Sequence, residues 1–181
     1  MPKQVAFLRA INVGGHTVKM ARLRGIFADM GFAQVETYIA SGNVIFETQF
    51  TDRRTLERTI EGHLREVLSY DVATFIRSIS ELEGIVGYEP FPGAGRRRDE
   101  ATLYIGFVAE PPNQAAIDGL RAFATETDAF HVHGSEVYWL CSTRMSDSKF
   151  SGALLEKTLG MAATLRNANT VRKILAKYDG S

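Results

Sequence analysis

Apolar and polar residues follow one another with two different spacings, and the change between the spacings marks the expected elements. Compact or alternating apolar stretches, typical of strands, occupy residues 4–10, 34–41, 44–48 and 72–78 of the first half. Apolar residues three and four apart, typical of helices, occur over residues 19–31 and after a cap at Thr51 or Asp52. Ser80 and Glu83 have the spacing of a capping box and predict a short helix toward Tyr88.

The segment EPFPGAGRRRDE, residues 89–100, interrupts this pattern, because Pro, Gly and three arginines are typical of an exposed connection. Strand patterns resume at residues 101–109, 129–133, 136–142 and 162–166, and helical patterns follow Pro111-Pro112 and cover 152–160 and 169–178. Both halves therefore predict the order strand-helix-strand-strand-helix-strand, the ferredoxin-like βαββαβ plan. We predict an α+β protein with two ferredoxin-like subdomains in tandem, residues 1–89 and 101–181, joined by a linker at 90–100. The second subdomain carries an extra C-terminal helix.

The stretch YIASGNVIF, Tyr38 to Phe46, places Gly-Asn between two apolar runs. Two connecting residues with Gly first predict a type II′ hairpin turn at Gly42-Asn43, and Gly134-Ser135 predicts the same turn in the second half. In this register Ser41 pairs with Val44, Ile39 with Phe46 and Tyr38 with Glu47. Ile39, Val44 and Phe46 then face the helices.

The βαββαβ plan also predicts a candidate site. Its first two strands point the same way, so the end of the first strand and the hairpin after the second share one edge of the sheet. The residues expected at that edge are Asn12, Gly14, Gly15, His16, Lys19, Ser41, Gly42 and Asn43. A glycine-rich loop that enters a helix offers backbone N–H groups and a positive dipole end to an anion, and Lys19 adds charge. The spacing fits neither a Walker loop nor GxGxxG. A tight turn that packs against a hairpin explains the same residues without a ligand.

Composition narrows the function classes only slightly. The chain has 181 residues with 45% hydrophobic residues, and 21 basic residues balance 21 acidic ones, so net charge gives no reason to expect a nucleic acid or a membrane. A single cysteine, Cys141, allows no intrachain disulfide and fits a reducing compartment. The first residues do not form a signal peptide and no apolar run is long enough to span a membrane. We therefore expect a cytoplasmic protein.

The motifs LRAINVGG with Lys19-Met20, TYIASGNVIF, LEKTLG and TLRNANT together make the chain resemble a bacterial family catalogued as domain of unknown function 1697. The resemblance covers nearly the whole chain and implies an α+β fold of two subdomains, but no established activity. The positions that match the family pattern are Leu8, Arg9, Asn12, Gly14, Gly15, Lys19, Met20, Tyr38, Ser41, Gly42, Asn43, Arg166, Asn167, Asn169 and Thr170. The chain departs from the pattern at Ala10, Leu165 and Ala168.

Two further motifs have both a structural and a functional interpretation. In RNANT, Asn169 is a natural helix cap. Arg166 either pairs with a carboxylate such as Glu156 or, with Asn167, contributes to an anion site. In HVH, His131 and His133 share one strand face with Tyr138 and Glu136, and Tyr104 on the neighbouring strand is expected to join them. No third strong metal ligand is fixed by spacing, so we predict no metal and no cofactor.

We therefore hypothesise a binding protein for an anionic ligand at the Gly-Gly loop and Ser-Gly-Asn edge. The ligand would be a phosphorylated small molecule, a nucleotide or an RNA. The first alternative is an enzyme that acts on a phosphorylated or nucleotide substrate at the same place, although only Ser41 with His16 suggests a nucleophile and its base. The second alternative is a protein–protein interaction module that uses the sheet face with Tyr104, His131 and Tyr138.

Overall fold

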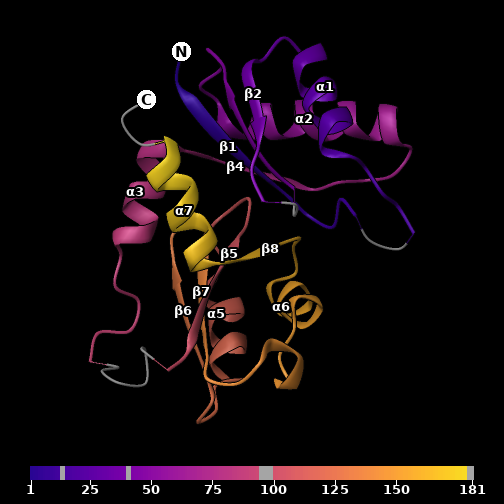
Figure 1. Ribbon diagram of the computed structural model, residues 1–181. Coiled ribbons are helices and arrows are strands. Elements are labelled where there is room, and N and C mark those ends of the chain that lie inside the picture. Colours follow the sequence, from indigo (N-terminus) through magenta and orange to yellow (C-terminus); the bar gives the residue numbers. More distant parts are fainter. Residues whose placement is uncertain (13–14, 40–41, 94–99, 179–181) are drawn as a thin grey trace. The chain divides into compact units, whose positions relative to one another are not determined.

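The computed structural model describes residues 1–12, 15–39, 42–93 and 100–178, and its contacts divide the chain into two compact units (Figure 1). Unit 1 comprises Met1–Glu83 and Lys177–Ser181, and unit 2 comprises Gly84–Ala176. Each unit has one four-stranded sheet in which all neighbouring strands are antiparallel. Six α-helices and one short 3-10 helix lie within the described residues, so the predicted α+β class is confirmed.

Unit 1 is built from four strands and the helices between them. Its elements in chain order are β1 (Lys3–Leu8), α1 (Met20–Asp29), β2 (Ala33–Thr37), β3 (Asn43–Glu47), α2 (Arg53–Leu68), β4 (Thr74–Ser78) and the start of α3 (Ile79–Gly87). The strand order is β2-β3-β1-β4, so β1 lies between β3 and β4. The first helix ends where Gly31 adopts a φ of +89°, and the second begins where Asp52 accepts a hydrogen bond from Thr55 N at 3.0 Å.

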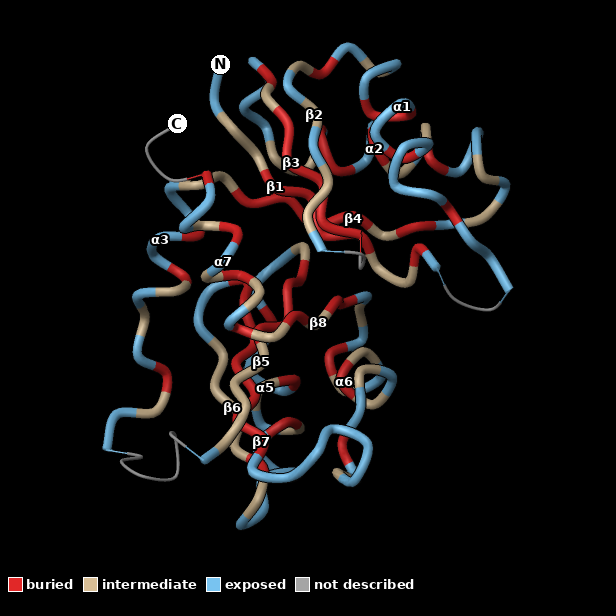
Figure 2. The backbone as a smooth tube through the Cα atoms, viewed as in Figure 1, coloured by how far each residue is buried: buried red, intermediate tan, exposed pale blue. Residues whose placement is uncertain are grey.

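The core of unit 1 lies between its sheet and helices α1 and α2 (Figures 1 and 2). Alternate strand residues are apolar on this face, and the two helices present their buried stripes to it. The strand residues are Ala6, Leu8, Val44, Phe46 and Ile76, and the helix residues are Leu23, Ile26, Phe27, Leu56, Ile60 and Leu64. Each fully buried large side chain contributes about 1.5–3 kcal/mol, and this burial fixes which face of β1 points to the helices.

The hairpin between β2 and β3 differs from the predicted one. Thr37 pairs with Val44, and Tyr38 N donates to Asn43 O at 3.1 Å, so the connection runs over residues 39–42 and the predicted register is wrong by four residues. Asn43 starts β3 because its Nδ2 donates to Tyr38 O at 3.1 Å. Ile39 is 41% exposed instead of facing the helices. The predicted positive φ at Gly42 is confirmed at +76°.

Unit 2 repeats the same element order. Its elements are β5 (Thr102–Phe107), α5 (Gln114–Arg121), β6 (Asp128–His133), β7 (Glu136–Cys141), a 3-10 helix (Met145–Asp147), α6 (Gly152–Leu159), β8 (Thr164–Asn167) and α7 (Ala168–Tyr178). The strand order is β6-β7-β5-β8. Here the predicted two-residue connection at Gly134-Ser135 is confirmed, because His133 pairs directly with Glu136 and Gly134 has a φ of +59°.

The core of unit 2 centres on Trp139, which is fully buried between the sheet and its helices. Its Nε1 donates to Asp128 Oδ1 at 2.8 Å, so the polar end of this large side chain is satisfied inside the core. Val137 and Cys141 lie on the same face of β7 and belong to the same core. The predicted placement of Tyr104 is wrong: Tyr104 pairs with Trp139, not with Tyr138, so it lies on the core face.

Two predicted helix caps are also displaced. The capping box of α3 consists of Ser78 and Glu81, not Ser80 and Glu83: Glu81 N donates to Ser78 Oγ at 3.1 Å and Ser78 N donates to Glu81 Oε2 at 2.8 Å. At the start of α7, Asn167 Oδ1 accepts from Asn169 N at 2.9 Å, so Asn167 has the role predicted for Asn169. Both shifts arise because each helix follows its strand without an intervening loop.

Candidate functional site

In unit 1, the end of β1 and the hairpin between β2 and β3 lie next to each other, as predicted. Leu8 N donates to Gly42 O at 2.9 Å, which joins the end of β1 to the hairpin. Beyond this bond, Asn12, Gly42 and Asn43 line one shallow hollow together with Met20 at the start of α1. Its volume of about 10 Å³ leaves room for little more than one water molecule. A larger ligand at this edge would therefore lie on the surface.

The two amide side chains at this edge are both used by the fold. Asn12 Oδ1 accepts from Val18 N at 2.7 Å and closes the loop that leads into α1. Asn43 is 1% exposed, and its Nδ2 holds the carbonyl oxygen of Tyr38. Each bond lies within its own segment, the first in the loop and the second in the hairpin, and the two bonds account for both residues without a ligand.

The start of α1 is the electropositive part of this edge. Lys19 occupies the N-cap position, makes no side-chain capping bond and is exposed, and the first turn contains no acidic residue. Orphan N–H groups and the helix dipole at such an end favour an anion. Gly15 has a φ of +85° in open space. The predicted site residues Gly14 and Ser41 lie outside the described residues, as do the three arginines at 96–98 in the predicted connection.

His16 lies beside this edge and stacks on Tyr70 with ring centroids 4.0 Å apart. Tyr70 in turn donates from its hydroxyl to Ile11 O at 2.8 Å, and burial raises the pKa of this phenol. The ring of His16 is therefore held by an aromatic contact that also anchors the chain just after β1.

The remaining predicted site residues, Arg166 and Asn167, belong to unit 2. The Arg166 side chain is buried, and its Nη1 donates to Thr164 Oγ1 at 2.7 Å and to Leu165 O at 2.9 Å. Burial lowers the pKa of its guanidinium to about 10. Asn167 lines a polar hollow of about 310 Å³ with Asn169 and Arg172, where Arg172 Nη1 donates to Asn169 Oδ1 at 2.8 Å.

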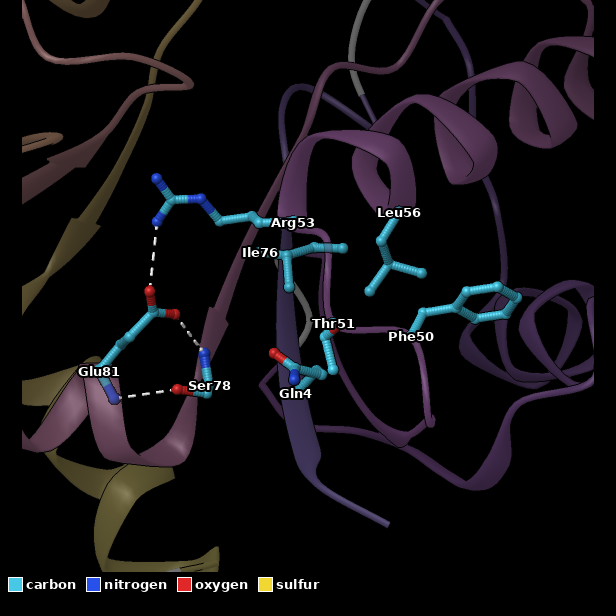
Figure 3. Close-up of a pocket in the computed structure, with 8 residues that line it drawn as sticks. All are labelled: Gln4, Phe50, Thr51, Arg53, Leu56, Ile76, Ser78 and Glu81. Carbon is cyan, nitrogen blue, oxygen red and sulfur yellow. Dashed lines mark hydrogen bonds and ion pairs between the residues drawn. The ribbon is translucent and has the colours of Figure 1, made fainter.

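A hollow of about 230 Å³ in unit 1 was not predicted from the sequence (Figure 3). It lies where β1 starts, β4 ends and α2 begins. Figure 3 shows Arg53, Glu81 and Ser78 linked on one side, Leu56 and Phe50 on the other, and Gln4 with Thr51 between them. The eight residues that line it are Gln4, Phe50, Thr51, Arg53, Leu56, Ile76, Ser78 and Glu81.

The strand register contained a signal for this hollow. Gln4 pairs with Phe46 on one side and with Ser78 on the other, so these three positions share the face that holds the core. Apolar residues occupy the next core-facing positions, Ala6 and Ile76, whereas Gln4 and Ser78 are polar. Polar residues in the core-facing row of two paired strands indicate the point where the core ends, but only the pairing shows that the two residues are neighbours.

The two charged residues that line this hollow, Arg53 and Glu81, form an ion pair with each other. Arg53 Nη1 lies 3.3 Å from Glu81 Oε1, and Arg53 Nε lies 3.9 Å from Glu57 Oε1. Glu57 is fully buried, and desolvation raises the pKa of its carboxyl against the opposing effects of Arg54 and the Ile76 N–H. Arg54 Nη1 lies 2.5 Å from Glu57 Oε2. Arg53 therefore faces carboxylates of both α2 and α3.

The histidine face of unit 2 is partly covered by its own chain. His131 pairs with Tyr138 and His133 with Glu136, as predicted. Tyr88 stacks on His133 with ring centroids 3.9 Å apart, and its hydroxyl lies 2.7 Å from His131 Nε2. Tyr138 is 1% exposed and donates to Ile85 O at 2.8 Å. The predicted docking face therefore lacks Tyr104, which lies on the other face, and offers no accessible Tyr138.

Within the described ranges, no group of three or more His, Cys, Asp or Glu is arranged to hold a metal ion. The helices in the same ranges include none that is long and apolar enough to cross a membrane.

Comparison with known proteins places the chain in a family. A family model described as a protein of unknown function (DUF1697) matches residues 1–138. The solved structure of the conserved bacterial protein SP0830 from Streptococcus pneumoniae has a similar fold, with a TM-score of 0.75 and 24% sequence identity over 97% of each chain. No curated protein matched the chain. The match over residues 1–138 confirms the resemblance carried by the N-terminal motifs, and the chain belongs to the DUF1697 family.

Proposed function

We propose that unit 1 binds a small anionic ligand, a phosphorylated metabolite, a nucleotide or an RNA phosphate, at the edge formed by residues 12–20 and 37–43. The observation that carries this proposal is the uncapped start of α1, with exposed Lys19 and no acidic residue in the first turn. Asn12 and Asn43 fix the loop and hairpin on either side of it. Arg166 and Asn167 are not needed, because the Arg166 guanidinium already donates to Thr164 and Leu165.

The proposal predicts that Lys19→Ala abolishes ligand-dependent stabilisation without unfolding the protein. A ligand at 100 times its dissociation constant stabilises the folded state by about 2.7 kcal/mol, which raises the melting temperature of a chain of this size by roughly 5–10 °C. The measurement is a thermal-shift series with inorganic phosphate, pyrophosphate, sugar phosphates, nucleotides and a short RNA.

Two variants serve as controls. Lys19→Arg should keep most of the shift, and Lys149→Ala, which removes an exposed lysine of unit 2, should leave it unchanged. A shift that persists in Lys19→Ala, or the absence of any shift across the series, would contradict the proposal. Product analysis of the sample that shifts separates simple binding from the alternative of an enzyme at the same place.

We also infer that each unit is a ferredoxin-like fold. Support comes from the shared element order and from the strand orders β2-β3-β1-β4 and β6-β7-β5-β8, in which the first strand of each unit lies between the third and the fourth. Inter-strand NOEs that join β1 to both β3 and β4, and β5 to both β7 and β8, would test this.

A further inference from the structure

The hollow of Figure 3 is lined by the amide side chain of Gln4. Gln4 is half-buried on the core-facing side of β1, and its amide makes no hydrogen bond to another residue in the part of the chain that the structure describes. A glutamine amide presents one donor group and one acceptor in a single plane. Ser78, its cross-strand neighbour, is by contrast explained by its bonds with Glu81.

The rest of the hollow combines an apolar floor with an exposed aromatic ring. Leu56 and Ile76 are 3% and 1% exposed and belong to the core of unit 1. Phe50, in the connection before α2, is 64% exposed at the rim. Aromatic rings of this kind stack on planar ligands irrespective of their exact identity.

The charges around the hollow favour a neutral ligand. Its eight lining residues include one cation, Arg53, and one anion, Glu81, and these two form an ion pair. Arg53 also faces the buried carboxylate of Glu57 at 3.9 Å. A phosphate would have to compete with two carboxylates for this guanidinium, so an uncharged group fits the wall better than an anion does.

We propose that this hollow binds an uncharged planar heteroaromatic group, a nucleobase or nucleoside. The ring lies against Phe50 and over Leu56 and Ile76, and its hydrogen-bonding edge meets the Gln4 amide, as Gln pairs with the donor–acceptor edge of adenine in nucleic-acid complexes. The volume of about 230 Å³ is below the usual range for drug-sized ligands and suits a single base with part of its sugar. The site is separate from the α1 edge, because Gln4 lies near the start of β1 and Asn12 lies beyond its end.

The test is a titration of the full chain with adenosine, followed by two-dimensional amide NMR, with guanosine, uridine and AMP in parallel. We expect saturable shifts at residues 4, 50, 51, 76 and 78, and, measured at these residues, an affinity for AMP no higher than for adenosine. Phe50→Ala and Gln4→Glu should each weaken adenosine binding at least tenfold. Gln4→Glu keeps the shape of the side chain and removes its donor.

Two control variants distinguish the loss of this site from the loss of any exposed aromatic ring. Phe123→Ala removes another exposed phenylalanine, in unit 2, and should bind as the wild type does, while Phe50→Tyr keeps the ring and should retain binding. Each variant is first checked for a dispersed native spectrum. No saturable shift with any nucleoside, shifts confined to other residues, or wild-type affinity in both Phe50→Ala and Gln4→Glu would overturn the proposal. Lys19→Ala should leave adenosine binding to this hollow unchanged. The proposal for the α1 edge and the proposal for this hollow are therefore tested independently.

Discussion

At the scale of single residues, Gly42 has the strictest local requirement in the described part of unit 1. Its φ is +76°, and a Cβ at this position would lie 3.1 Å from Leu8 Cβ and 3.0 Å from Ile11 Cγ2. Gly31 has a similar φ of +89° but open space around it. Substitutions at the two glycines therefore distinguish the energetic cost of a left-handed backbone, which both positions share, from the cost of crowding, which only Gly42 has.

We expect Gly42→Ala to lower the free energy of unfolding by about 2–4 kcal/mol, because left-handed backbone costs about 1 kcal/mol and crowding in a packed region adds about 1–3 kcal/mol. Gly31→Ala should cost only about 1 kcal/mol. Urea denaturation of both variants against the wild type measures the difference. Equal losses in the two variants would show that the contact between β1 and the hairpin is looser than described.

At the scale of elements, β6 contains a histidine whose surroundings lower its pKa and so favour its neutral form. Burial lowers the pKa of His131, and the neighbouring charges of His133 and Arg121 lower it further. Tyr88, Phe91 and Tyr138 surround the same face, with the Tyr88 hydroxyl 2.7 Å from Nε2. The unfolded chain binds a proton at this residue at a higher pH than the folded chain does.

Acidification should therefore destabilise unit 2. The contribution of His131 is complete above about pH 6.5, the ordinary pKa of histidine, and is lost as the pH falls through its lowered folded-state pKa. Thermal unfolding at pH 7.5 and pH 5, with NMR titration of the imidazole, measures both quantities. His131→Gln should show a smaller loss between these pH values. An imidazole that titrates above pH 6.5 would disprove the assignment.

At the scale of the whole molecule, unit 1 is completed by residues from the far end of the chain. Helix α7 ends at Tyr178, which is 5% exposed and whose hydroxyl donates to Glu36 Oε2. The ring of Tyr178 meets that of Tyr38 edge-on at 6.5 Å, and Lys177 Nζ lies 3.9 Å from Glu36 Oε2. The C-terminal end of α7 therefore supplies part of the contacts that hold β2.

Tyr178→Ala should destabilise unit 1 by about 3 kcal/mol, the usual cost of removing a buried aromatic ring, and Tyr178→Phe by about 1 kcal/mol for the lost hydrogen bond. Hydrogen exchange should show the loss of protection first in β2 and β3. Lys173→Ala, an exposed change on the same helix, is the control. Unchanged protection in Tyr178→Ala would refute the dependence of β2 on the C-terminal residues.

The sequence by itself determined most of the structural features that depend on residues close together along the chain. Apolar spacing predicted the strands and helices of both units. The cap of α2 was predicted at Thr51 or Asp52 and is Asp52, and the predicted turn glycines Gly42 and Gly134 both have a positive φ. It also predicted that the end of β1 and the hairpin meet, because that follows from strand direction alone. These features depend on backbone preference and burial within a few residues.

Tertiary structure alone decided which residues face each other across strands. The β2–β3 register depended on the buried Asn43 amide, the face of Tyr104 on its pairing with Trp139, and the cap of α3 on the exact end of β4. The Figure 3 hollow arose because Gln4 and Ser78, 74 residues apart in sequence, are paired through their strands. A shift of pairing by one residue reverses the face of a side chain, and only the assembled sheet fixes that pairing.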